Sequence, residues 1–238
     1  MGLVEYTIQE HVALVTLNDR DNRFNPPFLE ALLEVLDHIE QGSQARTLLV
    51  RSSHDKIFSN GIDLDWLQPL LQQNNLDAAK QFFHQLNRLF KRLLTYPLVT
   101  IAAITGHAFG GGAILACAFD FRFMRSDRGF FCLPEVDVGV PFLPGMIALL
   151  RSAIPSHVLR EMQLTGVRLT GESCERHHIV QKACPLHELL TVSLAFARQV
   201  NKQRAIVAEI KSRSNREIIR VMDEADTPYI EGGRYVVA

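Results

Sequence analysis

The sequence has few cysteines and almost no net charge. Its four cysteines form no C-x-x-C pair and no zinc-binding spacing, so we expect reduced, buried thiols, as in a cytosolic type of compartment. The formal net charge of -1 at pH 7 gives no reason to expect a polyanionic partner. It therefore argues against nucleic acid as a ligand.

Long apolar runs and targeting signals are also missing. No segment reaches the roughly 18 uninterrupted apolar residues of a membrane helix, so we expect no membrane partner. Residues 1–10 show no basic region followed by an apolar run. Tyr6 stands where a myristoylation signal needs Ser or Thr, and residues 236–238 are not a peroxisomal or ER-retention tripeptide. These absences predict a cytoplasmic protein.

The sequence does contain enough apolar residues for one sizeable domain. It has 238 residues, of which 47% are hydrophobic and 21% are charged, which is typical of a globular domain with a substantial core. Segments with strand and helix patterns alternate from Thr47 onward, and this alternation predicts an α/β fold.

The expected elements follow from apolar periodicity and from turn residues. Strands are predicted at residues 4–8 and 12–17, which form a hairpin, and at 47–51, 98–104, 120–125, 129–133 and 179–182. Helices are predicted at residues 28–40, 63–71, 77–94, 113–119, 145–153, 157–164, 171–177, 186–200 and 205–224. Residues 18–25, 52–60 and 139–144 are predicted loops, and the stretch from Pro228 is expected to fray.

One junction combines polar backbone groups with a carboxylate. Gly106 and the run Gly110, Gly111 and Gly112 separate a predicted buried strand from an apolar helix. Glycines allow a ligand to approach the backbone closely, and the N–H groups at a helix start point at one spot. Glu135 follows an apolar stretch. N–H donors and a carboxylate in apolar surroundings indicate enolate chemistry, in which the donors stabilise an oxyanion and the carboxylate moves a proton.

Each of these features also has a simpler interpretation. The glycine run could be a tight turn, because it lacks the spacing of a Rossmann dinucleotide site and the lysine of a phosphate-binding loop. Asn60-Gly61 is a turn signal, Asp63 could cap a helix, and Glu135 could be a solvated carboxylate at a strand end. The histidines lack neighbouring ligands, which argues against a metal site. No G-x-S-x-G elbow supports a serine hydrolase.

Three segments in series resemble a known family. They are residues 58–64 (Phe-Ser-Asn-Gly-Ile-Asp-Leu), 106–112 (Gly-His-Ala-Phe-Gly-Gly-Gly) and 133–139 (Leu-Pro-Glu-Val-Asp-Val-Gly). In order and spacing they resemble the signature segments of the enoyl-CoA hydratase/isomerase (crotonase) superfamily. Residues 58–61 and 128–137 are most similar to its Δ3,Δ2-enoyl-CoA isomerase branch. The resemblance covers nearly the whole chain, from the first hairpin to the helices near Ala197.

The resemblance implies a fold, a substrate class and an assembly. The expected fold is an α/β spiral of repeated ββα units over residues 1–185, which holds an acyl-CoA site. Residues 186–238 would form C-terminal helices that build a homotrimer or a dimer of trimers. Coenzyme A is then part of the substrate, and no separate cofactor or metal is expected.

The resemblance also assigns roles to individual residues. The backbone N–H groups of Ile62 and Gly111 match the family's oxyanion hole for the thioester carbonyl. The CoA moiety would lie against a block made of Ser59, Asn60, Gly61, Asp63 and Leu64. Arg23 is a further candidate, for a phosphate contact.

One departure from the family pattern selects the reaction. Hydratases of the family carry two glutamates that hold the added water. Glu135 matches one of them, but Ile114 stands at the position of the other. A single carboxylate suits a 1,3-proton transfer, in which a proton leaves C2 of a 3-enoyl thioester and returns at C4 through a dienolate. An acyl-pocket wall of Ile114, Phe142 and Leu143 would exclude water and raise the pKa of Glu135. If the local chain is extended, Asp137 would share a face with Glu135 and could be a second acid.

The leading hypothesis is an isomerase that converts a 3-enoyl-CoA to the 2-trans-enoyl-CoA, with Glu135 as its sole proton shuttle. One alternative is a different crotonase-type reaction, either an enoyl-CoA hydratase or an acyl-CoA thioester hydrolase. A second is a non-catalytic acyl-CoA-binding member of the fold. Residues 66–78 and 140–146 are expected to shape the acyl pocket.

Overall fold

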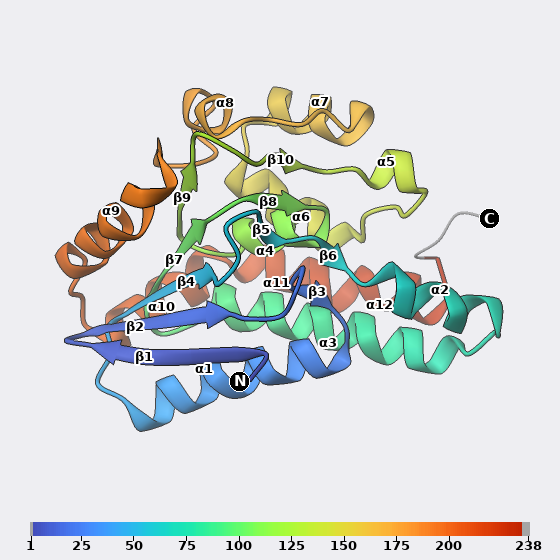
Figure 1. Ribbon diagram of the computed structural model, residues 1–238. Helices are drawn as coiled ribbons and strands as arrows, with labels where there is room; N and C mark the ends of the chain where they lie inside the picture. Colours follow the sequence, from blue (N-terminus) through green and yellow to red (C-terminus); the bar gives the residue numbers. More distant parts are fainter. Residues whose placement is uncertain (1, 235–238) are drawn as a thin grey trace.

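A six-stranded sheet forms the centre of the computed structural model, which describes residues 2–234. Its strand order is β1 (Val4–Gln9), β2 (Val12–Leu17), β4 (Thr47–Ser52), β7 (Val99–Ile104), β9 (Phe121–Arg125) and β11 (Lys182–Cys184). The β1–β2 hairpin is antiparallel, and the other neighbours are parallel. The expected α/β fold is therefore confirmed, with a mainly parallel sheet (Figure 1).

A second, smaller sheet positions the candidate site. It consists of the short parallel strands β10 (Phe131–Cys132), β8 (His107–Phe109) and β5 (Ile57–Ser59), in that order. A two-stranded parallel pair, β3 (Arg23–Phe24) and β6 (Gly61–Ile62), lies beside it. The pairs β4–β5, β7–β8 and β9–β10 each give one strand to the large sheet and one to the small sheet, and helices follow each pair. This is the repeated ββα pattern that the resemblance implies.

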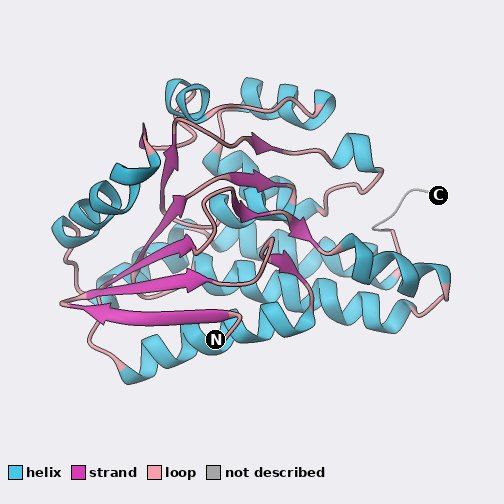
Figure 2. Cartoon of the chain, in the orientation of Figure 1, coloured by secondary structure: helices cyan, strands magenta, loops and turns pink. Residues whose placement is uncertain are grey.

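Twelve helices surround the sheets in the described residues (Figure 2). They are α1 (Pro26–Gly42), α2 (Leu64–Gln72), α3 (Leu76–Leu94), α4 (Gly111–Cys117), α5 (Glu135–Val138), α6 (Pro144–Ala153), α7 (Ser156–Thr165), α8 (Gly171–Arg176), α9 (Leu186–Gln199), α10 (Arg204–Ser214), α11 (Arg216–Glu224) and α12 (Asp226–Glu231). Helix α1 begins where the Asn25 side chain accepts a hydrogen bond from Phe28 N at 3.1 Å.

The large sheet is covered on both faces because its strands alternate between two apolar cores. In β4, Leu48 and Val50 belong to the larger core, which packs against α1, α3 and α4. Leu49 between them belongs to a smaller core under α9, together with Leu189 and Ala197. Parallel strands buried on both faces explain why residues 48–50 and 101–104 are uniformly apolar.

Several predicted boundaries were wrong, chiefly where strands are very short. The predicted loops 18–25 and 52–60 contain β3 and β5, and the glycine segment contains β8. The last sheet strand is β11, whereas the sequence pattern predicts 179–182. The predicted helix 205–224 is divided into α10 and α11 at Asn215. The stretch from Pro228 lies partly in α12, where Ile230 is buried, so it is not frayed there; residues 235–238 lie outside the described part.

Two buried polar contacts fix the C-terminal helices to the core. Lys211 Nζ on α10 donates to Asp120 Oδ2 at 2.9 Å, so Asp120 joins a helix to the sheet. Asp226 at the start of α12 accepts a hydrogen bond from Gly145 N at 2.7 Å and another from Asn87 Nδ2 at 2.8 Å.

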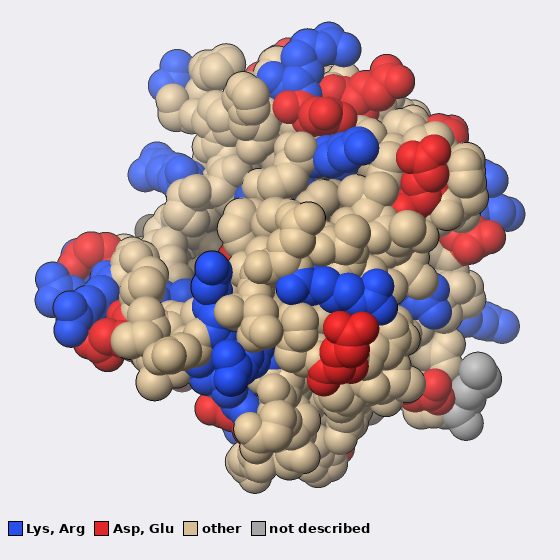
Figure 3. Space-filling model, turned by 90° about the vertical axis from the view of Figure 1, so that its left-hand side faces the viewer, with Lys and Arg blue, Asp and Glu red and all other residues tan. Residues whose placement is uncertain are grey.

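Figure 3 shows the molecule from the left of Figure 1. Residues other than Lys, Arg, Asp and Glu make up most of this face, and Lys and Arg side chains lie around its middle. Among the described residues, no helix is both long and apolar enough to cross a membrane.

Candidate active site

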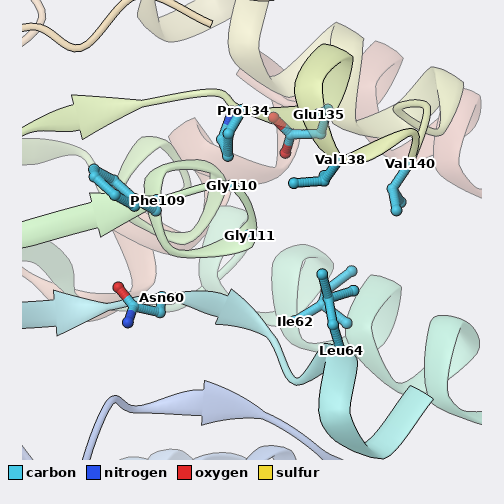
Figure 4. A pocket seen from close by; sticks show the side chains of 10 residues that line it. All are labelled: Asn60, Ile62, Leu64, Phe109, Gly110, Gly111, Pro134, Glu135, Val138 and Val140. Atoms are coloured by element: carbon cyan, nitrogen blue, oxygen red, sulfur yellow. The ribbon is translucent and has the colours of Figure 1, made fainter. Parts of the chain in front are cut away.

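The three segments that carry the candidate residues meet at one edge of the small sheet. Ile62 follows β5, Gly111 follows β8, and Glu135 follows β10, and these three strands are parallel neighbours. Because the carboxyl ends of parallel strands lie at the same edge, residues from three separate repeats come together there. They line one cavity of about 160 Å³, and Figure 4 shows Glu135 on one side of it and Ile62 on the other.

Glycines are required at this edge because two backbone segments touch. A Cβ on Gly61, which has φ +74°, would lie 2.5 Å from Gly111 N. A Cβ on Gly111 would lie 3.1 Å from the Phe24 ring and 3.2 Å from Gly61 Cα. A Cβ on Gly112 would collide with Ser59 O. The run of glycines is therefore more than a tight turn: it allows α4 to begin against β6.

Two backbone N–H groups at this contact have no backbone acceptor in their own elements. Gly111 is the first residue of α4, so its N–H is one of those that a helix leaves unpaired. In the β3–β6 pair, Asp63 N donates to Phe24 O at 3.0 Å. Since successive N–H groups of a strand point to opposite sides, the N–H of Ile62 points away from β3. Both residues line the cavity.

Glu135 brings the only ionisable side chain to the cavity among the described residues that line it. Its Oε2 atom is buried and, within residues 2–234, has no hydrogen-bond partner. Its Oε1 atom would lie 3.3 Å from a Cβ on Gly110, so the carboxylate rests directly against the glycine segment. Burial in these apolar surroundings raises the pKa of Glu135 to about 7.

This arrangement suits a reaction that builds negative charge on an oxygen and moves a proton nearby. A carbonyl oxygen placed between the two N–H groups would be stabilised as it becomes an oxyanion. A carboxylate with a pKa near 7 can take up a proton and return it at neutral pH. The geometry thus combines an electrophilic site with a single acid/base group.

A sequence model of the family described as enoyl-CoA hydratase/isomerase matches residues 7–227. The chain belongs to this family. Enoyl-CoA delta isomerase 3 of Arabidopsis thaliana is 33% identical to it over 223 residues, which cover 88% of this chain and 91% of that protein. Peroxisomal enoyl-CoA delta isomerase 2 of the same plant is 36% identical over 176 residues, which cover 71% and 72% of the two chains.

Other members of the enoyl-CoA hydratase/isomerase family widen the range of reactions among its relatives. Carnitinyl-CoA dehydratase of Salmonella arizonae is 33% identical over 192 residues, which cover 80% of this chain and 69% of that protein. A solved structure of a family protein from Pseudomonas syringae superimposes with a TM-score of 0.87 at 25% identity, over 96% of this chain and 97% of the other. The crotonase fold expected from the sequence is confirmed.

Part of the predicted CoA-binding block faces the cavity. Asn60 and Leu64 line it, beside the predicted oxyanion donor Ile62. Gly61 is buried against Gly111. Ser59 is fully buried: its Oγ donates to Asn22 O at 2.7 Å and accepts from Gly61 N at 3.1 Å. The hydroxyl of Ser59 thus shapes the turn before Gly61.

The two charged residues predicted to contact CoA form an ion-pair cluster. Arg23 Nη1 lies 2.6 Å from Asp65 Oδ2 and 3.6 Å from Asp63 Oδ1, and Arg23 Nη2 lies 3.3 Å from Asp21 Oδ2. These three carboxylates reduce the positive charge that Arg23 could offer to a phosphate. The sequence did not reveal this cluster, because its members come from two separate segments, residues 21–23 and 63–65.

The three residues predicted for the acyl-pocket wall lie in different places. Phe142 lines a second cavity of about 400 Å³, which also touches Glu135. Ile114 and Leu143 are each 1% exposed and belong to the larger core, and neither lines this cavity or the one at the oxyanion donors. Their predicted contact with an acyl chain stays a prediction.

Asp137 does not share a face with Glu135. Residues Glu135–Val138 form the short helix α5, between Pro134 and Gly139. Residues two apart in a helix point in nearly opposite directions, and Asp137 Oδ2 lies against Gly166 at the end of α7. The extended chain that would have made Asp137 a second acid is absent, so its carboxylate joins α5 to α7.

Five residues that complete the cavity wall received no individual site role from the sequence: Phe109, Gly110, Pro134, Val138 and Val140. Two of them lie in segments that the sequence did single out, since Gly110 belongs to the glycine junction and Val140 to the segment 140–146. Gly110 and Pro134 directly precede the predicted site residues in the chain, so their positions could have been inferred from the parallel strands. Val138 and Val140 reach the cavity only because Gly139, with φ +70°, turns the chain back after α5.

His107 is held by aromatic packing. Its ring centroid lies 5.0 Å from that of Phe109 and 5.6 Å from that of Phe130, and its Nδ1 accepts a hydrogen bond from Phe130 N at 3.3 Å. In the part of the chain that the structure describes, no group of three or more His, Cys, Asp or Glu residues could hold a metal ion.

Proposed function

We propose that this family member is an enoyl-CoA Δ3,Δ2-isomerase with Glu135 as its sole acid/base group. The observation that carries the proposal is the single buried carboxylate, unpaired within residues 2–234, in the cavity of the two N–H donors. The position where family hydratases carry a second glutamate holds Ile114, which is buried in the core. A second carboxylate for water activation is therefore missing from that place.

In the proposed reaction the thioester oxygen lies between the N–H groups of Ile62 and Gly111. Glu135 removes a proton from C2 of the 3-enoyl group, and the electron pair is delocalised over C2, C3, C4 and the carbonyl oxygen as a dienolate. Reprotonation at C4 by the same carboxyl group leaves the double bond between C2 and C3. One oxyanion-hole donor typically contributes about 10²–10³ in rate.

Relatives support this reaction and also define its main competitor. Two proteins named enoyl-CoA delta isomerases are 33% and 36% identical to the chain. A carnitinyl-CoA dehydratase is also 33% identical, which favours water addition or removal as the second candidate. Thioester hydrolysis, or acyl-CoA binding without turnover, would also be compatible with the cavity.

The test is to mix the purified protein with a 3-enoyl-CoA and follow the ultraviolet absorbance of the conjugated 2-enoyl thioester. Glu135→Gln should lower kcat by about 10²–10⁴, the usual contribution of acid/base catalysis. Asp137→Asn is the matched control and should retain activity, since its carboxylate faces Gly166.

The products separate these reactions. A 3-hydroxyacyl-CoA product would indicate a hydratase, and free CoA would indicate a thioester hydrolase. Binding of CoA thioesters without any turnover would indicate a non-catalytic member. A product that forms equally fast with Glu135→Gln would place the base on another residue.

We also propose that the chain acts as a homotrimer or a dimer of trimers. Residues 1–185 would hold the acyl-CoA site and residues 186–238 would provide the contacts between subunits. Two exposed isoleucines of α10, Ile206 and Ile210, support this assignment, because they are 57% and 58% exposed and lie one helical turn apart. No cofactor beyond the CoA of the substrate is needed for the proposed chemistry.

A further inference from the structure

Glu135 stands between two cavities. The first, of about 160 Å³, contains the oxyanion donors. The second, of about 400 Å³, is lined by Val136, Pro141, Phe142 and Ile147 beside Glu135 itself, with Gly139 and Gln163. Apart from Glu135 and Gln163, these side chains are apolar. Glu135 is thus shared by the walls of the two cavities.

A third cavity shares two lining residues with the second. Phe142 and Ile147 also line this third cavity, of about 330 Å³, so they stand between the two. The third cavity is completed by Pro144, Ala148 and Arg151 and by two residues of the C-terminal helices, Val221 of α11 and Tyr229 of α12. Each cavity therefore shares lining residues with the next: Glu135 belongs to the first and second, and Phe142 and Ile147 belong to the second and third.

We propose that the acyl chain of the substrate runs past Glu135 into the second cavity, and that longer chains pass between Phe142 and Ile147 into the third. Phe142 and Ile147 then determine which chain lengths are accepted, and Val221 and Tyr229 contact the end of a long chain. This inference rests on the proposed function, because it takes the substrate to be a 3-enoyl-CoA.

The chemistry of the reaction agrees with this direction for the chain. The carboxylate must reach both C2 and C4, so the carbons beyond C4 begin next to Glu135, which both cavities share. The first cavity already holds the thioester group at the two N–H donors. The apolar second cavity begins at Glu135 and is the larger of the two, and it removes methylene groups from water.

The contact between α12 and α6 sets the width of the third cavity. Asp226 is fully buried, and it accepts a hydrogen bond from Gly145 N, in the turn of α6 between Phe142 and Ile147. A side chain at Gly145 would collide with Met222 of α11. The C-terminal helices are thus held close to the two residues that separate the cavities.

The experiment compares kcat/KM for 3-dodecenoyl-CoA and 3-hexenoyl-CoA, expressed as a ratio. Val221→Phe fills the third cavity and should lower this ratio about 15-fold, which corresponds to two methylenes that are no longer buried at about 0.8 kcal/mol each. Ile147→Phe should lower it as well, and Phe142→Ala should raise it. Leu164→Phe is the matched control, because Leu164 is 69% exposed on α7 and lines none of the three cavities.

Calorimetric affinities for the saturated hexanoyl-CoA and dodecanoyl-CoA provide a readout that does not depend on turnover. If no isomerisation occurs with any substrate, the proposed function fails, but the same change in affinity ratio would still support the channel. If folded Val221→Phe and Ile147→Phe keep the wild-type ratio in both kinetics and binding, the channel is wrong, whether or not the protein is an isomerase.

Discussion

At the scale of single residues, the carboxyl group of Glu135 behaves differently from a carboxyl group in water. Burial raises its pKa to about 7. In the proposed reaction the free enzyme needs Glu135 ionised, so kcat/KM should fall about tenfold per pH unit below pH 7 and level off above it. A pH–rate profile with a 3-enoyl-CoA tests this expectation. A flat profile down to about pH 5.5 would indicate a different base.

The same pKa has a consequence for stability. The unfolded chain loses the Glu135 proton near pH 4.5 and the folded chain near pH 7. The folded state thus binds one more proton between these values, and the free energy of unfolding falls as pH rises through this window, by roughly 3 kcal/mol in total. Glu135→Gln cannot ionise, so it should exceed wild type in urea stability at about pH 8 but not near pH 4.5. Equal stabilities at the higher pH would show that the ionised carboxylate is well solvated.

Gly61 illustrates how strictly the backbone contact limits substitution. Gly61→Ala would force a side chain into the left-handed region at φ +74° and against Gly111 N. It should lower the free energy of unfolding by about 1–3 kcal/mol, measured as a lower urea midpoint. It should also abolish most of the activity. Gly42→Ala is the control: nothing lies within 4 Å of its added Cβ, so its midpoint should stay the same or rise slightly.

At the scale of elements, the buried contact between Lys211 and Asp120 determines how α10 lies on the sheet. Lys211 Nζ is within 2.9 Å of Asp120 Oδ2 and 3.4 Å of Thr100 Oγ1. Lys211→Met keeps most of the packing but leaves Asp120 without its cation, which should cost about 1–3 kcal/mol, because Asp120 is partly solvated. Denaturant unfolding measures this.

Arg213→Met, on the same helix, is the matched control for Lys211→Met. Arg213 pairs with Glu209 on the exposed side of α10, and solvent screens such pairs. Its removal should leave the unfolding midpoint nearly unchanged. Comparable losses of stability in Lys211→Met and Arg213→Met would show that the change in helix propensity, and not the loss of the Lys211–Asp120 ion pair, lowers the unfolding midpoint.

The long elements and the short ones differ in how well the sequence predicts them. The apolar residues recur at helical spacing in α1 and α3 and form apolar runs in β2, β4 and β7. These elements can therefore be predicted directly from the sequence. Strands of two or three residues, such as β3, β6 and β8, contain no such period. They exist because distant segments pair with them, and a single sequence does not show that pairing.

The candidate site shows the same difference between features with a local sequence signal and features that depend on distant segments. Glu135, Gly111 and Ile62 lie in segments with strong local signals, and the structure brings all three to one cavity. The environment of Arg23 depends on Asp21, Asp63 and Asp65 meeting in space. The direction of Asp137 depends on one turn of helix. Sequence reasoning thus located these candidate residues more readily than their neighbours.

At the scale of the whole molecule, the proposed assembly makes a direct prediction. Ile206 and Ile210 are exposed on one face of α10. We expect analytical ultracentrifugation to give a trimer or hexamer. The double variant Ile206→Glu/Ile210→Glu should give smaller species, because buried charges oppose association.

The outcome for this variant separates two possibilities. A wild-type monomer would remove residues 186–238 from any role in assembly. A trimer that persists in the double variant would place the subunit contacts on another surface, away from α10.

The division of the site over three repeats also determines when the site becomes complete during synthesis. Strands β3, β6 and β8 with the start of α4 precede strand β10 in the chain, so both N–H donors are made before the carboxylate. Domains generally fold as units. A nascent chain that ends within the second repeat would contain both N–H donors proposed for the thioester oxygen but not Glu135. Only the third repeat adds the proposed acid/base group, so the complete site requires that all three repeats have been made.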